Sequence, residues 1–196
     1  MKNIKSIILI MTSAAIFTGC GDFLDKEPLS SGTESIAFKT PEQFMQAANA
    51  LYNLEGWKDY NGGSAMQSSR VDSRNCNILL EKAETYAGDK SALNGSIGTA
   101  RFFRAWQHFY LLQLFGGIPI ADHVFDVSDP VLFGARNSRY EVIQFIVNDL
   151  REAIQLLPQE KNIADADKGK VSVEAAKAFL ARVLLYEATW EKYVPN

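Results

Sequence analysis

The sequence predicts an all-α fold, a helical bundle with tetratricopeptide-like helix pairs. Apolar residues recur at helical spacing in five segments, helix-capping residues precede several of them, and no segment alternates in the manner of a half-buried strand. The repeat-like pairing is expected from residues 140–173, which span roughly one 34-residue repeat as helix, loop and helix. We justify the helices in chain order.

The first helix is expected to begin at Pro41, a residue suited to a first helical turn. Thr40 can cap it, and Gln43, three residues later, completes a capping box. Its apolar face is Phe44, Ala47, Ala48, Leu51 and Leu54. A glycine-rich break at residues 55–64 follows, and a second helix with a partial apolar stripe is expected at about 65–86.

The third helix, at about residues 96–115, is apolar on nearly every side, which predicts a central place in the bundle. Arg101, Arg104 and His108 argue against a membrane span, because charges at mid-bilayer are costly. These three residues share one helical face. They could form a site for an anionic ligand. We favour a polar stripe that pairs with acids on a neighbouring helix, because a buried face carries Arg mainly when it is paired.

The last two helices have strong start signals. Ser138 and Glu141 form a capping box ahead of an amphipathic stripe that Pro158 ends, and Ser172 opens the final helix. Long loops are expected at residues 121–137 and 159–171. After the last helix the sequence offers no closing helix and no capping repeat with a polar outer face, so we expect an incomplete C-terminus. We also expect an aggregation-prone product, because the third and last helices carry apolar faces that the missing part should cover.

The composition argues against several functional classes. The 196-residue chain has a net charge of −3 and two His, which disfavours a nucleic-acid binder and a His-rich metal site. Asp165 and Asp167 resemble part of a calcium loop, but no Glu follows at the required spacing, so a solvated loop is favoured. Cys76 is expected to be a small buried residue. The common catalytic motifs are not found, and we expect no enzyme, no catalytic residue, no metal and no cofactor.

The N-terminus has the features of an export signal. Lys2 and Lys5 precede an uncharged apolar run at residues 7–17, which is too short to span a bilayer. Cys20 follows directly, in an arrangement that resembles the lipobox of bacterial lipoproteins. We therefore expect a signal peptide at residues 1–19 and acylation of Cys20, for example with palmitate. The alternative is an ordinary secretory signal that is removed together with Cys20.

Several sequence blocks occur in the order and spacing of one known family. They are residues 20–28 (CGDFLDKEP), 100–106 (ARFFRAW), 111–120 (LLQLFGGIPI), 140–158 and 169–186. Together they resemble the N-terminal part of the SusD/RagB family. The chain departs from the family at Thr99, where Glu is usual, and in a short stretch between Trp57 and Arg70. The resemblance suggests a lipidated tether at residues 20–39 and a SusD-like helical domain at 40–196, incomplete at its C-terminus.

The resemblance implies a function. Members of the family are surface lipoproteins of the Bacteroidetes outer membrane that bind glycans or peptides and cover SusC-like TonB-dependent transporters. The expected function is thus binding of a glycan or oligosaccharide at the cell surface and its delivery to such a transporter, without catalysis. The long helices would also suit a helical-repeat scaffold lipoprotein that has no small-molecule ligand.

Candidate ligand-binding residues lie in the glycine-rich break. They are Trp57, Tyr60 and Asn61. Aromatic rings in loops can stack on sugars, and an Asn amide can hydrogen-bond to hydroxyl groups. The alternative is that these side chains pack against the helical bundle.

Overall fold

A computed structural model describes residues 37–52 and 65–194, with the backbone alone at 65–72. Within these residues the regular structure is entirely helical, which confirms the all-α prediction. The α-helices are α3 (Pro41–Ala50), α4 (Ala65–Glu84), α5 (Asn94–Phe115), α6 (Arg139–Leu156) and α7 (Val173–Tyr193). The expected signal peptide, Cys20 and most of the tether lie outside the described residues.

The helix starts follow the capping signals. The Gln43 side chain accepts hydrogen bonds from the backbone N–H groups of Lys39 and Thr40 before α3. The Ser138 backbone N–H donates to the Glu141 carboxylate at 2.7 Å before α6. These contacts satisfy N–H groups that have no partner within the helix. The first helix is shorter than predicted, because α3 ends at Ala50 and Leu54 lies outside the described residues.

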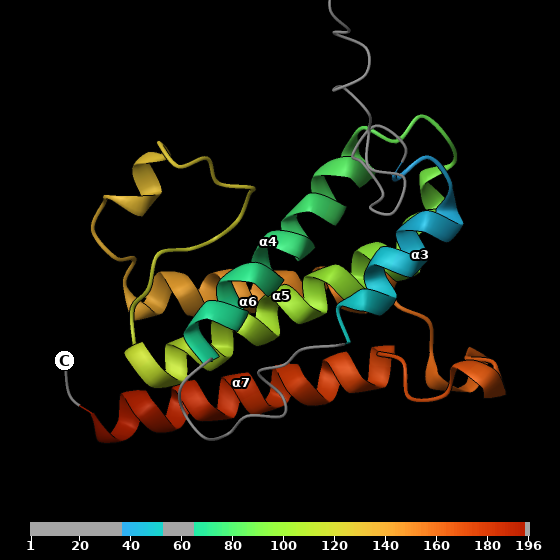
Figure 1. Cartoon of the computed structure of the whole chain (residues 1–196). Coiled ribbons are helices and arrows are strands. Elements are labelled where there is room, and N and C mark those ends of the chain that lie inside the picture. The colour runs from blue at the N-terminus through green and yellow to red at the C-terminus, as the bar shows by residue number, and fades with distance from the viewer. Residues whose placement is uncertain (1–36, 53–64, 195–196) are drawn as a thin grey trace, which may run out of the picture. The chain divides into compact units, whose positions relative to one another are not determined.

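Helix α5 lies at the centre of this part of the chain. It packs against α3, α4 and α6, while α7 covers α6 (Figure 1). Most of its length is buried, as its apolar composition predicts. The prediction of an apolar helix covered on every side is wrong at its C-terminal end, where Leu114 and Phe115 are about half exposed.

Aromatic contacts join α7 to α5. The ring of Phe179 on α7 lies 5.5 Å from Phe102, 4.8 Å from Trp106 and 5.5 Å from Phe109 on α5, measured between ring centroids. Such pairs contribute about 0.5–1.5 kcal/mol each beyond the area they bury. Cys76 is fully buried in the same core, as expected.

The two long connections contain different short helices. The α5–α6 connection begins at Gly116, whose φ of +70° favours glycine, and contains the short helix η3 (Pro130–Leu132). The α6–α7 connection contains η4 (Glu160–Asn162) and η5 (Asp165–Asp167). Asp165 and Asp167 are exposed, in agreement with a solvated loop. Across the described residues, we find no helix with the length and apolar character needed to cross a membrane.

Candidate functional site

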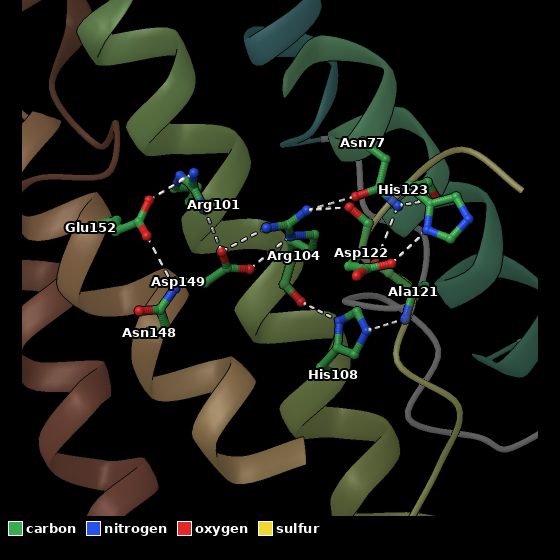
Figure 2. A network of polar contacts seen from close by, with 10 residues as sticks. All are labelled: Asn77, Arg101, Arg104, His108, Ala121, Asp122, His123, Asn148, Asp149 and Glu152. Carbon is green, nitrogen blue, oxygen red and sulfur yellow. Dashed lines mark hydrogen bonds and ion pairs between the residues drawn. The ribbon is translucent and has the colours of Figure 1, made fainter. Parts of the chain in front are cut away.

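A polar network lies between α5 and α6. Arg104 on α5 is almost fully buried and forms two hydrogen bonds with the Asp149 carboxylate of α6, each 2.7 Å long. Arg101 donates to the same carboxylate at 2.8 Å and pairs with Glu152 at 2.7 Å (Figure 2). This confirms, for the two arginines of the polar stripe, the prediction of pairing with acids on a neighbouring helix. His108, the third residue of the stripe, contacts backbone groups instead.

The remaining donors of Arg104 are also used. Its Nη1 donates to the Asn77 side-chain oxygen at 2.9 Å and to the Asp122 carbonyl at 3.0 Å. Burial opposes the charged form, but the hydrogen bonds and charge of Asp149 outweigh it, so the pKa of Arg104 is raised. The guanidinium is therefore committed to internal partners and is poorly placed to bind an external anion.

His108 completes this network as a neutral side chain. Its Nδ1 lies 2.8 Å from the Arg104 carbonyl oxygen, and its Nε2 lies 3.1 Å from the Ala121 backbone nitrogen. Since a carbonyl only accepts and an N–H only donates, Nδ1 carries the proton and Nε2 accepts. Burial lowers the pKa of His108 to about 4. Both ring nitrogens are occupied, which leaves none for a ligand.

The network holds residues 121–123 of the α5–α6 connection. Asn77 on α4 donates to the carbonyls of Ala121 and His123 at 3.1 and 2.7 Å (Figure 2). Together with the contacts of Arg104 and His108, these bonds tie residues 121–123 to two helices. The network thus has a structural role that connects three parts of the chain.

Sequence reasoning did not identify the acids that pair with the arginines, nor Asn77. Asp149 is an acid on the apolar stripe of α6, close to Ile146 and Ala153 in helical register, and this position was a usable signal for burial. Asn77 stands in the weakly patterned α4, and nothing in its sequence neighbourhood indicates that it meets residues 121–123.

A groove lies at the N-terminal end of α5. It has a volume of about 270 Å³ and runs between α3, the first turns of α5 and the α6–α7 connection. Its lining includes Met45, Asn49 and Tyr52 from α3 and the turn after it, Ser96 and Thr99 from α5, and Lys170. Glu42 adds a carboxylate opposite in charge to the Lys170 amine. This mixture of apolar surface with hydroxyl, amide and balanced charged groups suits a neutral polar ligand that also has an apolar face.

Tyr52 connects this groove to the candidate glycan residues along the chain. Its hydroxyl oxygen accepts a hydrogen bond from the Val171 N–H at 2.7 Å, and its ring contacts Phe103 edge-on. Tyr52 is also the last described residue before the stretch that contains Trp57, Tyr60 and Asn61. Those three residues lie outside the described part of the chain, so their role remains a prediction.

Comparison with known proteins identifies the family. The family model for SusD-like proteins, described as "Starch-binding associating with outer membrane", matches residues 73–185, more than half of the chain. The chain belongs to the SusD-like family. The matched stretch contains the whole polar network of Arg104, while α3 and Tyr52 lie outside it.

Individual SusD-like proteins resemble most of this chain. A SusD-like protein of Bacteroides ovatus is 29% identical over 227 residues, covering 95% of this chain and 40% of the relative. The crystal structure of a SusD-like protein from Bacteroides fragilis is 22% identical with a TM-score of 0.68, covering 85% of this chain and 39% of the other. This likeness supports the tetratricopeptide-like helical fold.

A third relative is called a laminarin-binding SusD-like protein. It is 28% identical with a TM-score of 0.57, covering 64% of this chain and 27% of the other. The SusD-like chain therefore spans less than half the length of each of these three relatives.

Proposed function

We propose that this SusD-like chain is part of a glycan-binding lipoprotein of the outer membrane that delivers its ligand to a SusC-like TonB-dependent transporter. The observation that carries the proposal is membership of the SusD-like family over residues 73–185. A relative named for laminarin binding supports a glycan as the ligand. The protein would act by binding and handing over its ligand, without a catalytic step or a cofactor.

The proposed anchor is acylated Cys20, exposed as the first residue when the signal peptide 1–19 is removed. Acyl chains contribute about 0.8 kcal/mol for each buried CH₂ group, so several chains on one residue anchor a protein stably. Residues 20–39 would be the tether, and the SusD-like helical domain from residue 40 would face the outside of the cell.

The proposed binding face combines two neighbouring features. Trp57, Tyr60 and Asn61 offer aromatic rings for the apolar faces of sugars and an amide for their hydroxyl groups. The groove lined by Tyr52 adds Asn49 and Ser96 as further polar contacts. Since only four residues separate Tyr52 from Trp57 in the chain, one oligosaccharide could contact both features.

Titration calorimetry with laminarin and with soluble starch tests ligand binding. We expect Trp57→Ala and Asn49→Ala to weaken binding by about tenfold each, equivalent to roughly 1.4 kcal/mol. Tyr140→Ala is the matched control, because Tyr140 is an exposed aromatic residue at the start of α6, outside the groove. The sugar chains should be recovered intact, without new reducing ends. Absence of binding to both glycans would overturn this assignment and favour the scaffold alternative.

Partnership and anchoring need separate measurements. The tagged protein is purified from detergent-solubilised outer membranes, and co-purifying proteins are identified by mass spectrometry. We expect a large TonB-dependent barrel, and its absence would contradict the transporter partnership.

Membrane fractionation of Cys20→Ala tests the anchor. The variant should leave the membrane fraction, and retention equal to wild type would refute lipidation at Cys20.

A further inference from the structure

The α5–α6 connection turns back on itself at a histidine between two acids. The Nδ1 of His123 lies 2.5 Å from Oδ1 of Asp122, and its Nε2 lies 2.7 Å from Oδ2 of Asp129. The His123 side chain is 44% exposed, so protons exchange readily with water. Asp129 also caps η3, because its Oδ1 accepts the Val131 N–H at 2.9 Å.

Two carboxylate contacts require two protons on the ring. A neutral imidazole carries one N–H, whereas an ionised carboxylate only accepts hydrogen bonds. Both contacts are therefore hydrogen bonds only when His123 is an imidazolium. The hydrogen bonds to Asp129 and then Asp122 raise the pKa of His123, and the hydrogen bond from His123 lowers the pKa of Asp129.

Side chains of α4 and α5 form hydrogen bonds with the backbone of residues 122–124. Glu81 on α4 accepts the Val124 N–H at 2.7 Å, and Asn77 donates to the His123 carbonyl at 2.7 Å. Arg104 on α5 donates to the Asp122 carbonyl, and its own charge is balanced by Asp149 (Figure 2). The charged groups around His123 are thus Asp122, Asp129, Glu81 and Arg104.

The segment after the turn depends on contacts within the connection. At its base, the Asn137 N–H donates to the Ile118 carbonyl at 3.2 Å. Nearer its tip, the His123–Asp129 contact joins the two sides. The tip carries the exposed apolar residues Val127, Leu132 and Phe133. Whatever controls the His123–Asp129 contact therefore controls how this apolar tip is held.

We propose that His123 is a pH-sensitive clasp, which joins Asp122 and Asp129 when protonated and holds residues 125–133 less firmly when it loses a proton. A neutral ring keeps at most one of the two hydrogen bonds, and its unprotonated nitrogen then faces a carboxylate. This inference is independent of glycan binding and of the transporter.

The direction of the pH effect follows from the raised pKa of His123. Closure is complete below the ordinary histidine value of 6.5 and is lost as the pH rises through the raised pKa. At the acid end, closure persists until Asp129 is protonated, below the ordinary aspartate value of 3.8.

The test combines the full chain's histidine NMR titration with amide hydrogen exchange of residues 125–133 on both sides of the His123 transition. After correction for intrinsic rates, exchange should be up to about fivefold faster above the transition, the range for an exposed charge pair. Asp129→Asn should lower the His123 pKa towards 6.5 and abolish this difference. His123→Gln should give the fast rate at both pH values.

Asp126→Asn is the matched control. Asp126 lies in the same connection, but its carboxylate accepts the Ser128 N–H, so the clasp should survive the substitution. Unchanged protection of α5 amides reports that each variant is folded. The proposal is overturned if His123 titrates at or below 6.5, or if residues 125–133 exchange equally on both sides of its transition.

Discussion

Arg104 and Asp149, 45 residues apart in the chain, meet in a bidentate ion pair at the interface of α5 and α6. Both side chains are more than nine-tenths buried. A buried pair of this kind is costly to break, because the partner left behind keeps its charge without compensation. The same pair orients Arg104 towards the backbone at Asp122, and so links helix packing to the α5–α6 connection.

We predict that Arg104→Met destabilises the fold by about 3–5 kcal/mol, because Asp149 is left buried with less compensation. The double variant Arg104→Met/Asp149→Leu should lose less unfolding free energy than the two single variants lose together, because neither charge of the pair remains. Urea unfolding measures these differences. Arg101→Met is the control. Arg101 is 23% exposed, so its loss should cost about 1 kcal/mol or less. Equal losses for Arg101→Met and Arg104→Met would contradict the prediction.

We predict that acid destabilises the fold through His108. Its pKa is about 4 in the folded protein against 6.5 as the ordinary value, so the folded state binds the proton more weakly than the unfolded state. The stabilising contribution is full above pH 6.5 and declines towards pH 4, where the loss reaches about 3 kcal/mol. Unfolding free energies of wild type and His108→Gln between pH 7 and 4 measure it. If the unfolding free energy of wild type falls no more steeply towards pH 4 than that of His108→Gln, the assignment to His108 is wrong.

Two glycines should respond to alanine in opposite ways. A Cβ on Gly117 would collide with the backbone carbonyl of Asn137, so Gly117→Ala must displace one side of the α5–α6 connection. We expect a loss of about 1–3 kcal/mol. A Cβ on Gly95 in α5 meets nothing within 4 Å, and Gly95→Ala should stabilise by about 0.5–1 kcal/mol. Thermal unfolding of the pair distinguishes them, and a shift of the same sign for both would contradict the argument.

We predict that the outer face of α7 promotes association of the chain. Leu184 and Leu185 are 46% and 71% exposed, and contiguous exposed apolar surface favours aggregation. Leu184→Glu/Leu185→Glu should lower the apparent mass in light scattering. Lys177→Glu on the same helix is the control, because it makes the same change of −2 in net charge without removing apolar surface. If Lys177→Glu lowers the apparent mass equally, the change comes from charge alone and the prediction is wrong.

The helices were predictable because their signals are local. Capping residues and apolar spacing act within a few positions, and they located the starts of α3, α6 and α7 correctly. The end of α3 was missed, because the apolar spacing continues to Leu54 while the helix stops at Ala50. The pairing of the arginine stripe with acids was also predictable, since a buried Arg needs a partner on an adjacent helix.

The chain's sequence by itself determined the helical class, the central place of α5, the resemblance to the SusD/RagB family and the need of Arg104 for an acidic partner. Only the tertiary structure decided that this partner is Asp149, that Asn77 and His108 hold residues 121–123, and that His123 lies between Asp122 and Asp129. The physical reason is that periodicity and capping depend on neighbours in the chain. The hydrogen bonds from Arg104, His108 and Asn77 to other elements span 13 to 46 residues and depend on where separate helices and loops meet. The contacts of His123 span one and six residues and depend on how the connection turns.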